Sequence, residues 1–131
     1  ETPLLSADTI VVIDNEIINK PADRKDAMNM IAKLSGRTHS VFTGVAIFFN
    51  DKVDTFFVKS DVTFKELSKK EISDYCDTEE PYDKAGAYAV QGTGSFMVKS
   101  INGSYSNVIG LPVSEVIEHL QKLGILDGIK V

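Results

Sequence analysis

The sequence predicts an α/β fold, a mixed sheet flanked by helices, within a single domain over residues 1–131. Two observations predict it. Runs of β-branched and aromatic residues alternate with segments whose apolar residues recur at helical spacing. Short turn sequences separate the strand runs, so hairpins join them, and helices inserted between hairpins favour a mixed sheet over a purely parallel one. No repeat, low-complexity tract or flexible linker divides the chain.

The N-terminal half is predicted to hold a short hairpin, a helix and a long hairpin. β-branched Ile10–Ile13 followed by the turn pair Asp14-Asn15 indicates the short hairpin. Apolar residues at helical spacing between a cap residue, Asp23, and a stop residue, Gly36, indicate the helix. Two strand-like runs around the turn Asn50-Asp51-Lys52 indicate the long hairpin. The predicted bounds are 10–18, about 23–35, and 38–49 with 53–64.

The C-terminal half is predicted to hold two helices and one strand. Ser68-Lys69-Lys70-Glu71 has the form of a capping box, which predicts a short helix to about residue 77. Ser95–Ile101 is strand-like, and Asn102-Gly103 after it is a strong turn signal. Pro112 then opens a last helix, whose apolar stripe ends before Gly124.

Composition excludes several classes of protein. Apolar residues make up 43% and charged residues 25%, and no apolar run approaches the ~18 residues that span a bilayer, so we expect no membrane segment. Cys76 is the single cysteine, which excludes an intrachain disulfide and fits a cytoplasmic location. The net charge of -5 argues against binding a nucleic-acid polymer. A single nucleotide stays compatible, because a divalent cation can screen its charge.

Three charged side chains at predicted element ends could bind a ligand, and each has a plainer alternative. Asp8 precedes the Ile10–Ile13 run, where a carboxylate can ligate a metal or act as a general base, or simply cap a turn. Lys20 is held extended by Pro21 and can meet a phosphate or be a solvated loop lysine. Arg37 follows a helix stop and can bind a ligand or neutralise the helix C-terminus.

The segment EPYDKAGAYAVQG, residues 80–92, gathers polar groups around small residues. Glu80 and Asp83 can hold a hard cation such as Mg²⁺, and Lys84 can pair with phosphate oxygens. The small residues after Lys84 leave the backbone open to a ligand. Gln91 offers a donor and an acceptor side by side, complementary to the N–H and carbonyl edge of uracil or thymine. A charged surface turn and a core-edge glutamine are the alternatives.

Five blocks follow one another along the chain: ADTIVV, NKPADRKDA, LSGRTHSVFTGVAI, EPYDKAGAYAVQG and INGSYSNVIGLP. In this order they resemble the Maf family of nucleoside triphosphate pyrophosphatases, once described as septum-formation inhibitors. The resemblance runs through almost the entire chain. It implies a Maf/ITPase-like (anticodon-like) fold, a cleft for a nucleotide and a divalent cation, Mg²⁺ or Mn²⁺, and pairing into a homodimer.

The resemblance also assigns roles to several residues. Asp8 matches the catalytic acid of the family's Ala-Asp-Thr motif and would also ligate the metal. Lys20 matches the lysine of a Gly-Lys-Pro motif, although Asn19 replaces the glycine. The Glu-Pro-x-Asp-Lys motif is matched by the metal ligands Glu80 and Asp83 and by the catalytic cation Lys84.

Substrate binding is expected for three further residues, two of them from the resemblance. Thr9 and Gln91 match positions associated with the branch of the family that acts on dTTP and UTP, whereas acids usually stand there in the branch that handles methylated GTP. Arg37 is a further candidate for the phosphate oxygens.

Family members normally place a strand, a Ser-x-Ser-Pro-Arg-Arg segment and a helix before the Ala-Asp-Thr motif. This chain starts just before that motif, so the resemblance implies that the N-terminal strand, basic loop and helix of the family domain are missing. The implied reaction is metal-assisted hydrolysis, in which water attacks the α-phosphorus and releases a nucleoside monophosphate and pyrophosphate. The alternative function is a noncatalytic nucleotide-binding or interaction module, a fragment of a longer Maf protein.

Overall fold

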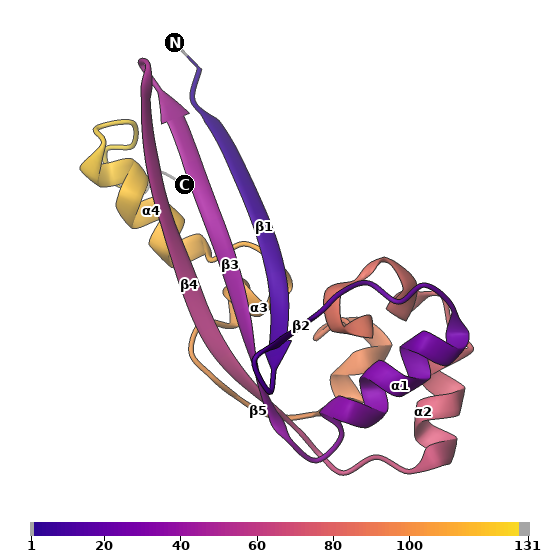
Figure 1. The fold of residues 1–131 in the computed structure, drawn as a ribbon. Coiled ribbons are helices and arrows are strands. Elements are labelled where there is room, and N and C mark those ends of the chain that lie inside the picture. Colours follow the sequence, from indigo (N-terminus) through magenta and orange to yellow (C-terminus); the bar gives the residue numbers. More distant parts are fainter. Residues whose placement is uncertain (1, 129–131) are drawn as a thin grey trace.

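The computed structural model describes residues 2–128 and confirms the predicted α/β class. Its longest strands, at residues 4–13, 38–49 and 52–64, extend well beyond a lobe that holds the helices at residues 24–34 and 69–76. We call this extension the arm (Figure 1). The strands are β1 (Leu4–Ile13), β2 (Glu16–Ile18), β3 (Thr38–Phe49), β4 (Lys52–Phe64) and β5 (Val98–Asn102). The helices are α1 (Arg24–Leu34), α2 (Lys69–Cys76), α3 (Tyr105–Ile109) and α4 (Val113–Lys122), with the short 3-10 helices η1 (Glu80–Asp83), η2 (Ala85–Ala87) and η3 (Gly92–Met97).

The five strands form one sheet in the order β2-β1-β3-β4-β5. Every pairing in the part of the sheet that residues 2–128 form is antiparallel, so the parallel pairs of a mixed sheet do not occur there. The reason is local connectivity. Tight turns make β1–β2 and β3–β4 hairpins, and the chain returns from α1 to place β3 antiparallel beside β1. The connection from β2 through α1 passes β1, so β2 and β3 lie on opposite sides of β1 and are not neighbours.

Most predicted elements are confirmed, because their end signals act locally. The Asp23 side chain accepts a hydrogen bond from the Asp26 backbone N–H and begins α1. Ser68 and Glu71 form both hydrogen bonds of the capping box at the start of α2. β3 has the predicted bounds, and β4 begins one residue early, at Lys52.

Three elements differ from the prediction. β1 starts at Leu4 instead of Ile10, because pairing with β3 extends through an exposed stretch of mixed polar and apolar residues that sequence periodicity does not mark as a strand. The predicted strand from Ser95 begins only at Val98, since the preceding residues form η3. The turn at Asn102-Gly103 leads into the unpredicted helix α3.

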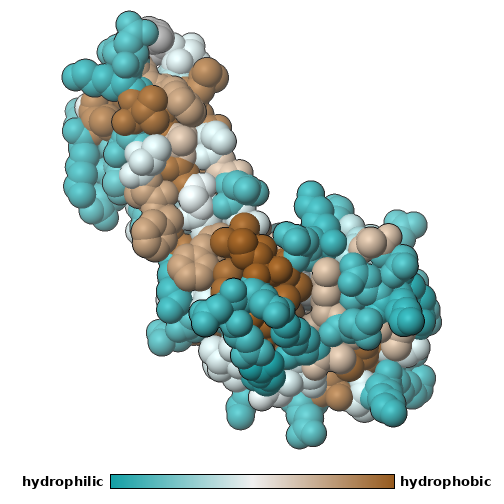
Figure 2. All heavy atoms as spheres, in the orientation of Figure 1, coloured by the Kyte–Doolittle hydropathy of each residue, from teal (hydrophilic) through white to brown (hydrophobic). Residues whose placement is uncertain are grey.

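Two hydrophobic clusters stabilise the molecule. The larger lies under α1 and α2 against the lower ends of the strands, with Ile31, Leu34 and Phe64 among its fully buried members. The smaller joins α4 to the arm through Val45, Ile47 and Val116. Figure 2 shows further hydrophobic side chains on the surface, most densely where the arm meets the helical lobe. Among residues 2–128, no helix has both the length and the apolar character that a membrane crossing requires.

Candidate active site

A pocket of about 230 Å³ lies between β1, the segment after β2, the turn that joins η1 to η2, and the end of α3. It is the place where most of the predicted site residues meet. The predicted residues that line it are Asp8, Thr9, Lys20, Asp83 and Lys84. The other lining residues are Val11, Val41, Ala85, Tyr88, Val108, Ile109 and Gly110.

Asp8 and Thr9 lie in the middle of β1, where they pair with Gly44 and Thr43 of β3. The prediction that Asp8 stands before its strand is therefore wrong. β2 pairs only with residues 11–13 of β1, so the stretch around Asp8 has β3 as its one strand neighbour among residues 2–128. A strand fixes the direction of its side chains more firmly than a loop does, which suits a residue that must meet a ligand.

Asp83 and Lys84 bring a charge pair to the pocket. The Lys84 ammonium lies 2.8 Å from a carboxylate oxygen of Asp83. This hydrogen bond lowers the pKa of Asp83 below its ordinary value, and the charge of Lys20 has a smaller effect in the same direction. Asp83 is therefore ionised at neutral pH. Lys20 and Lys84 supply two cations that can face the phosphates of a ligand.

Ala85, the first small residue after Lys84, lines the pocket, but the next two have a different role from the predicted one. Gly86 and Ala87 are buried instead of open to a ligand, and both have a left-handed backbone, with φ of 76° and 66°. A Cβ atom at Gly86 would lie 3.1 Å from both methyl groups of Val11. The absent side chain lets this turn pack directly on β1, and the Gly86 N–H donates to the Asn19 carbonyl at 3.2 Å. These contacts hold the lysine-bearing segments beside Asp8.

Glu80 does not line this pocket, and its contacts do not agree with the predicted role as a metal ligand. Its carboxylate accepts hydrogen bonds from the Tyr75 hydroxyl at 2.9 Å and from the backbone N–H groups of Thr93 and Gly94 at 3.1 and 2.9 Å. The side chain thus holds the start of η3 against α2. A carboxylate so fully engaged has little capacity left for a cation.

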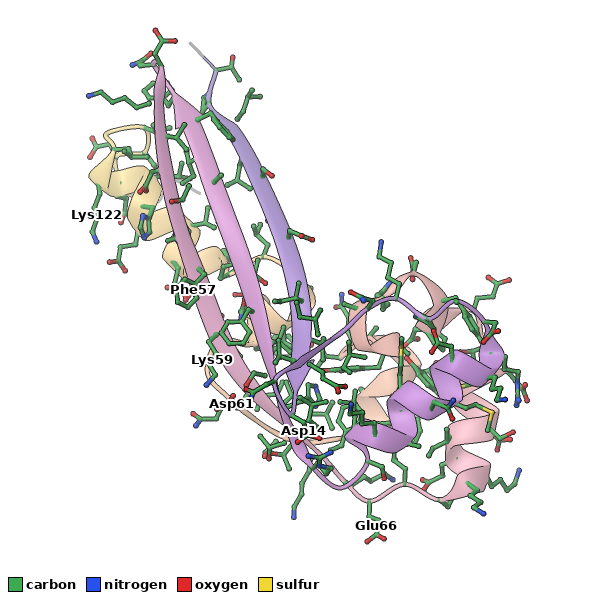
Figure 3. All side chains as sticks on the ribbon, in the orientation of Figure 1. Asp14, Phe57, Lys59, Asp61, Glu66 and Lys122 are labelled. Carbon is green, nitrogen blue, oxygen red and sulfur yellow. The ribbon has the colours of Figure 1, made fainter. Side chains whose placement is uncertain are left out.

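Arg37 and Gln91 also lie outside the pocket. An Arg37 nitrogen is 2.5 Å from a carboxylate oxygen of Asp14, and another donates to the Lys33 carbonyl at the end of α1. Figure 3 places Asp14 at the lower end of the sheet, close to the end of α1. The contacts fit the alternative role of Arg37 at a helix C-terminus. Gln91 is exposed just before η3.

The described residues, 2–128, do not build a complete metal cage. Within residues 2–128 there is no cluster of three or more His, Cys, Asp or Glu side chains able to hold an ion. Mg²⁺ commonly takes one or two protein carboxylates and completes its octahedron with water and substrate phosphates. Asp8 and Asp83, which line the same pocket, fit that kind of donor set.

A buried aromatic group supports the pocket from behind. Tyr88 lines the pocket, and its hydroxyl lies 2.6 Å from Nε2 of His39, which is 2% exposed. Phe64 packs edge-on against both rings. Burial lowers the pKa of His39 to about 4, although nearby Asp61 opposes the shift. His39 is neutral at pH 7, so it supplies packing and a hydrogen bond instead of charge.

The depressed pKa of His39 predicts a loss of stability in acid. The unfolded chain binds a proton near pH 6.5 and the folded chain only near pH 4, so stability is lost as pH falls through this window. We expect about 2 kcal/mol of the unfolding free energy to be lost by pH 5. Urea denaturation from pH 8 to pH 5 measures it. The difference between wild type and His39→Gln isolates this residue, and a difference that does not change with pH would contradict the prediction.

Sequence reasoning missed one wall of the pocket, formed by Val108 and Ile109 at the end of α3 and by Gly110, the residue that follows α3. The wall is fixed by Asn107, which is fully buried and donates to the Val41 carbonyl and the Ser60 hydroxyl. The only signal for it was the block INGSYSNVIGLP, which contributed to the family resemblance without suggesting a role.

The pocket defines a class of site: acidic and basic side chains on a rigid strand and turn, suited to an anionic ligand with a cation. Comparison with known proteins identifies the family. The family model for Maf-like protein matches residues 1–123, and the chain belongs to this family.

Curated relatives agree with the assignment. A dTTP/UTP pyrophosphatase from Thermosipho africanus (strain TCF52B) is 50% identical over 127 residues, which are 97% of this chain and 66% of the relative. Enzymes of the same name from Bacillus anthracis (strain CDC 684 / NRRL 3495) and Bacillus cereus (strain AH187) are 46% identical over 122 residues, or 93% of this chain and 64% of each relative. The chain thus spans slightly less than two thirds of the length of these relatives.

Proposed function

We propose that this chain forms the base-binding and catalytic part of a nucleoside triphosphate pyrophosphatase that converts dTTP or UTP to the monophosphate and pyrophosphate. One observation supports the proposal above the others. Asp8, Lys20 and the adjacent pair Asp83-Lys84 come from three separate segments of the sequence, yet they line one pocket. The names of the curated relatives supply the substrate class.

Each residue has a role that its chemistry allows. Asp8 orients or deprotonates the attacking water, or anchors the cation that lowers the pKa of that water. Asp83 is the second carboxylate for Mg²⁺ or Mn²⁺. Lys20 and Lys84 stabilise the charge that develops on the phosphate oxygens. Thr9, which lines the pocket together with the residues at the end of α3, faces the base in this proposal.

The pocket volume of about 230 Å³ is below the roughly 300–1,000 Å³ of complete small-molecule sites. It suits part of a nucleotide. We assign the remaining phosphate contacts to the N-terminal basic segment that the family resemblance implies. Homodimer formation and a cytoplasmic location belong to the same proposal, supported by the resemblance and by the single cysteine, respectively.

A pyrophosphate-release assay tests the proposal. The N-terminal segment of the Thermosipho africanus relative is fused ahead of this chain, and the fusion protein is compared with the 131-residue chain. We expect the fusion protein with Mg²⁺ to release pyrophosphate from dTTP and UTP faster than from the other common nucleotides. Absence of release from a folded fusion protein would overturn the enzymatic proposal. Nucleotide binding without release would favour the noncatalytic module.

Lys84→Met in the fusion protein is expected to lower kcat about tenfold to a hundredfold, because a positioned cation no longer meets the phosphate oxygens. The lost hydrogen bond to Asp83 would also let the pKa of that carboxyl rise toward its ordinary value. Lys70→Met is the matched control, since Lys70 is exposed on α2, forms an ion pair with Asp74 and does not line the pocket. Steady-state kinetics of both variants make the comparison. Equal rates would remove Lys84 from the mechanism.

A further inference from the structure

Two threonine hydroxyl groups and a backbone carbonyl form a row of polar contacts behind the pocket, and the proposed function gives the buried member of this row no role. Thr43 of β3 is fully buried, and its Oγ1 lies 2.8 Å from Oγ1 of Thr9 across the β1–β3 pair. The same Oγ1 lies 3.3 Å from the backbone carbonyl oxygen of Asn107 in α3. The three groups therefore form a line from the pocket wall into the core.

Both contacts of Thr43 can be hydrogen bonds at the same time in only one arrangement of protons. In this arrangement the single hydroxyl proton of Thr43 points to the Asn107 carbonyl, which accepts and cannot donate and which also accepts from the Gly110 N–H at 3.0 Å. Thr43 then has only lone pairs to offer Thr9, and the 2.8 Å contact must be donated by the Thr9 hydroxyl. Thr9 has no second proton. Toward the pocket, Thr9 thus presents lone pairs alone.

The far end of the line is fixed. The Asn107 side chain donates to the Val41 carbonyl at 3.2 Å and to the Ser60 hydroxyl at 3.0 Å. The Asn107 backbone N–H donates to Ser104, which caps α3. Since these bonds tie α3 to β3 and β4, the Asn107 carbonyl cannot turn away from Thr43 without breaking buried hydrogen bonds.

We propose that Thr43 is a positioning residue that makes Thr9 an obligate hydrogen-bond acceptor and so selects the base. The proposal rests on the proposed function, because it takes Thr9 to face the base. Uracil and thymine present an N–H at ring position N3, which an acceptor-only hydroxyl can receive. Cytosine presents a lone pair there, so its N3 and Thr9 would be two acceptors facing each other. A buried pair of that kind costs the desolvation of both groups.

The test uses the 131-residue chain with Mg²⁺ and the non-hydrolysable α,β-imido analogues of UTP and CTP, with affinities measured by titration calorimetry. We expect wild type to bind the uridine analogue at least about tenfold more tightly than the cytidine analogue. Thr43→Val keeps the shape but frees the Thr9 proton, so the preference should fall to about threefold or less. Thr43→Ser restores the hydroxyl and should restore the preference.

The outcomes separate this inference from a general packing role and from the enzymatic proposal. A packing defect in Thr43→Val would weaken the binding of both analogues equally and leave the ratio of their affinities unchanged. That result, in a variant that unfolds cooperatively, overturns the inference. A wild-type chain that binds both analogues equally, or neither, overturns it as well. If Thr43→Val loses the preference for the uridine analogue and Thr43→Ser keeps it, but the fusion protein releases no pyrophosphate, the enzymatic proposal alone fails.

Discussion

Asp8→Asn is expected to reduce pyrophosphate release from dTTP or UTP by at least about a hundredfold in the fusion protein, with little change in folding stability. An amide keeps the shape of the carboxylate but cannot take a proton from water and is a poor ligand for Mg²⁺. The side chain is exposed in β1, and the described contacts place it in no ion pair, so the fold does not depend on its charge.

The measurement is kcat with Mg²⁺ and again with Mn²⁺, beside thermal unfolding of the same variant. Asp51→Asn is the matched control, because Asp51 lies in the turn between β3 and β4, far along the arm from the pocket. The control should keep the wild-type rate. An Asp8→Asn variant that keeps full activity would show that the general base and metal anchor lie elsewhere.

The arrangement of Asp8, Lys20, Asp83 and Lys84 was predicted from the sequence, but only through the family resemblance. Composition and periodicity alone left a turn or solvent-exposed role open for Asp8 and Lys20. Local signals do not report which segments meet in space. The contact that brings the segments together is the packing of Gly86 on Val11, and it depends on the missing side chain of a glycine that sequence analysis interpreted as open backbone.

Glu80 and Arg37 were predicted as site residues but lie outside the pocket, because each charged side chain binds another part of the protein instead. Arg37 forms an ion pair with Asp14, which lies in the turn of the β1–β2 hairpin. Glu80 accepts backbone N–H groups thirteen and fourteen residues further along the chain. These hydrogen bonds between a side chain and a distant backbone depend on the path of η3, and no residue pattern in that segment predicts a 3-10 helix.

The strand and helix ends were predictable for a physical reason. Caps and turns act over three or four residues, as at Asp23 and at Ser68 with Glu71. β1 was underestimated because its first half, residues 4–8, is exposed and contains the polar residues Ser6 and Asp8, so only its register with β3 makes it a strand. Helix α3 is five residues long and is held by Asn107, so its stability comes from tertiary contacts more than from helix propensity.

The hydrogen bonds around Glu80 leave no room for a side chain at Gly94. A Cβ atom there would lie 2.3 Å from the Ala89 carbonyl oxygen, 2.8 Å from the Tyr75 hydroxyl and 2.9 Å from a Glu80 carboxylate oxygen. The nearest of these atoms belongs to the backbone and cannot rotate away. Since Tyr75 also donates to Glu80, relief of the clash would break the bonds that hold η3 to α2.

Gly94→Ala is therefore expected to lower the free energy of unfolding by about 4 kcal/mol, because it combines overpacking with the loss of a buried hydrogen-bond network. Gly44→Ala is the matched control, since nothing lies within 4 Å of a Cβ atom at Gly44 and its backbone is that of an ordinary strand. The control should be neutral or slightly stabilising, because alanine restricts the unfolded chain. Urea denaturation at pH 7 compares the two, and a Gly94→Ala variant as stable as the control would mean that η3 does not pack on Glu80 and Tyr75 as described.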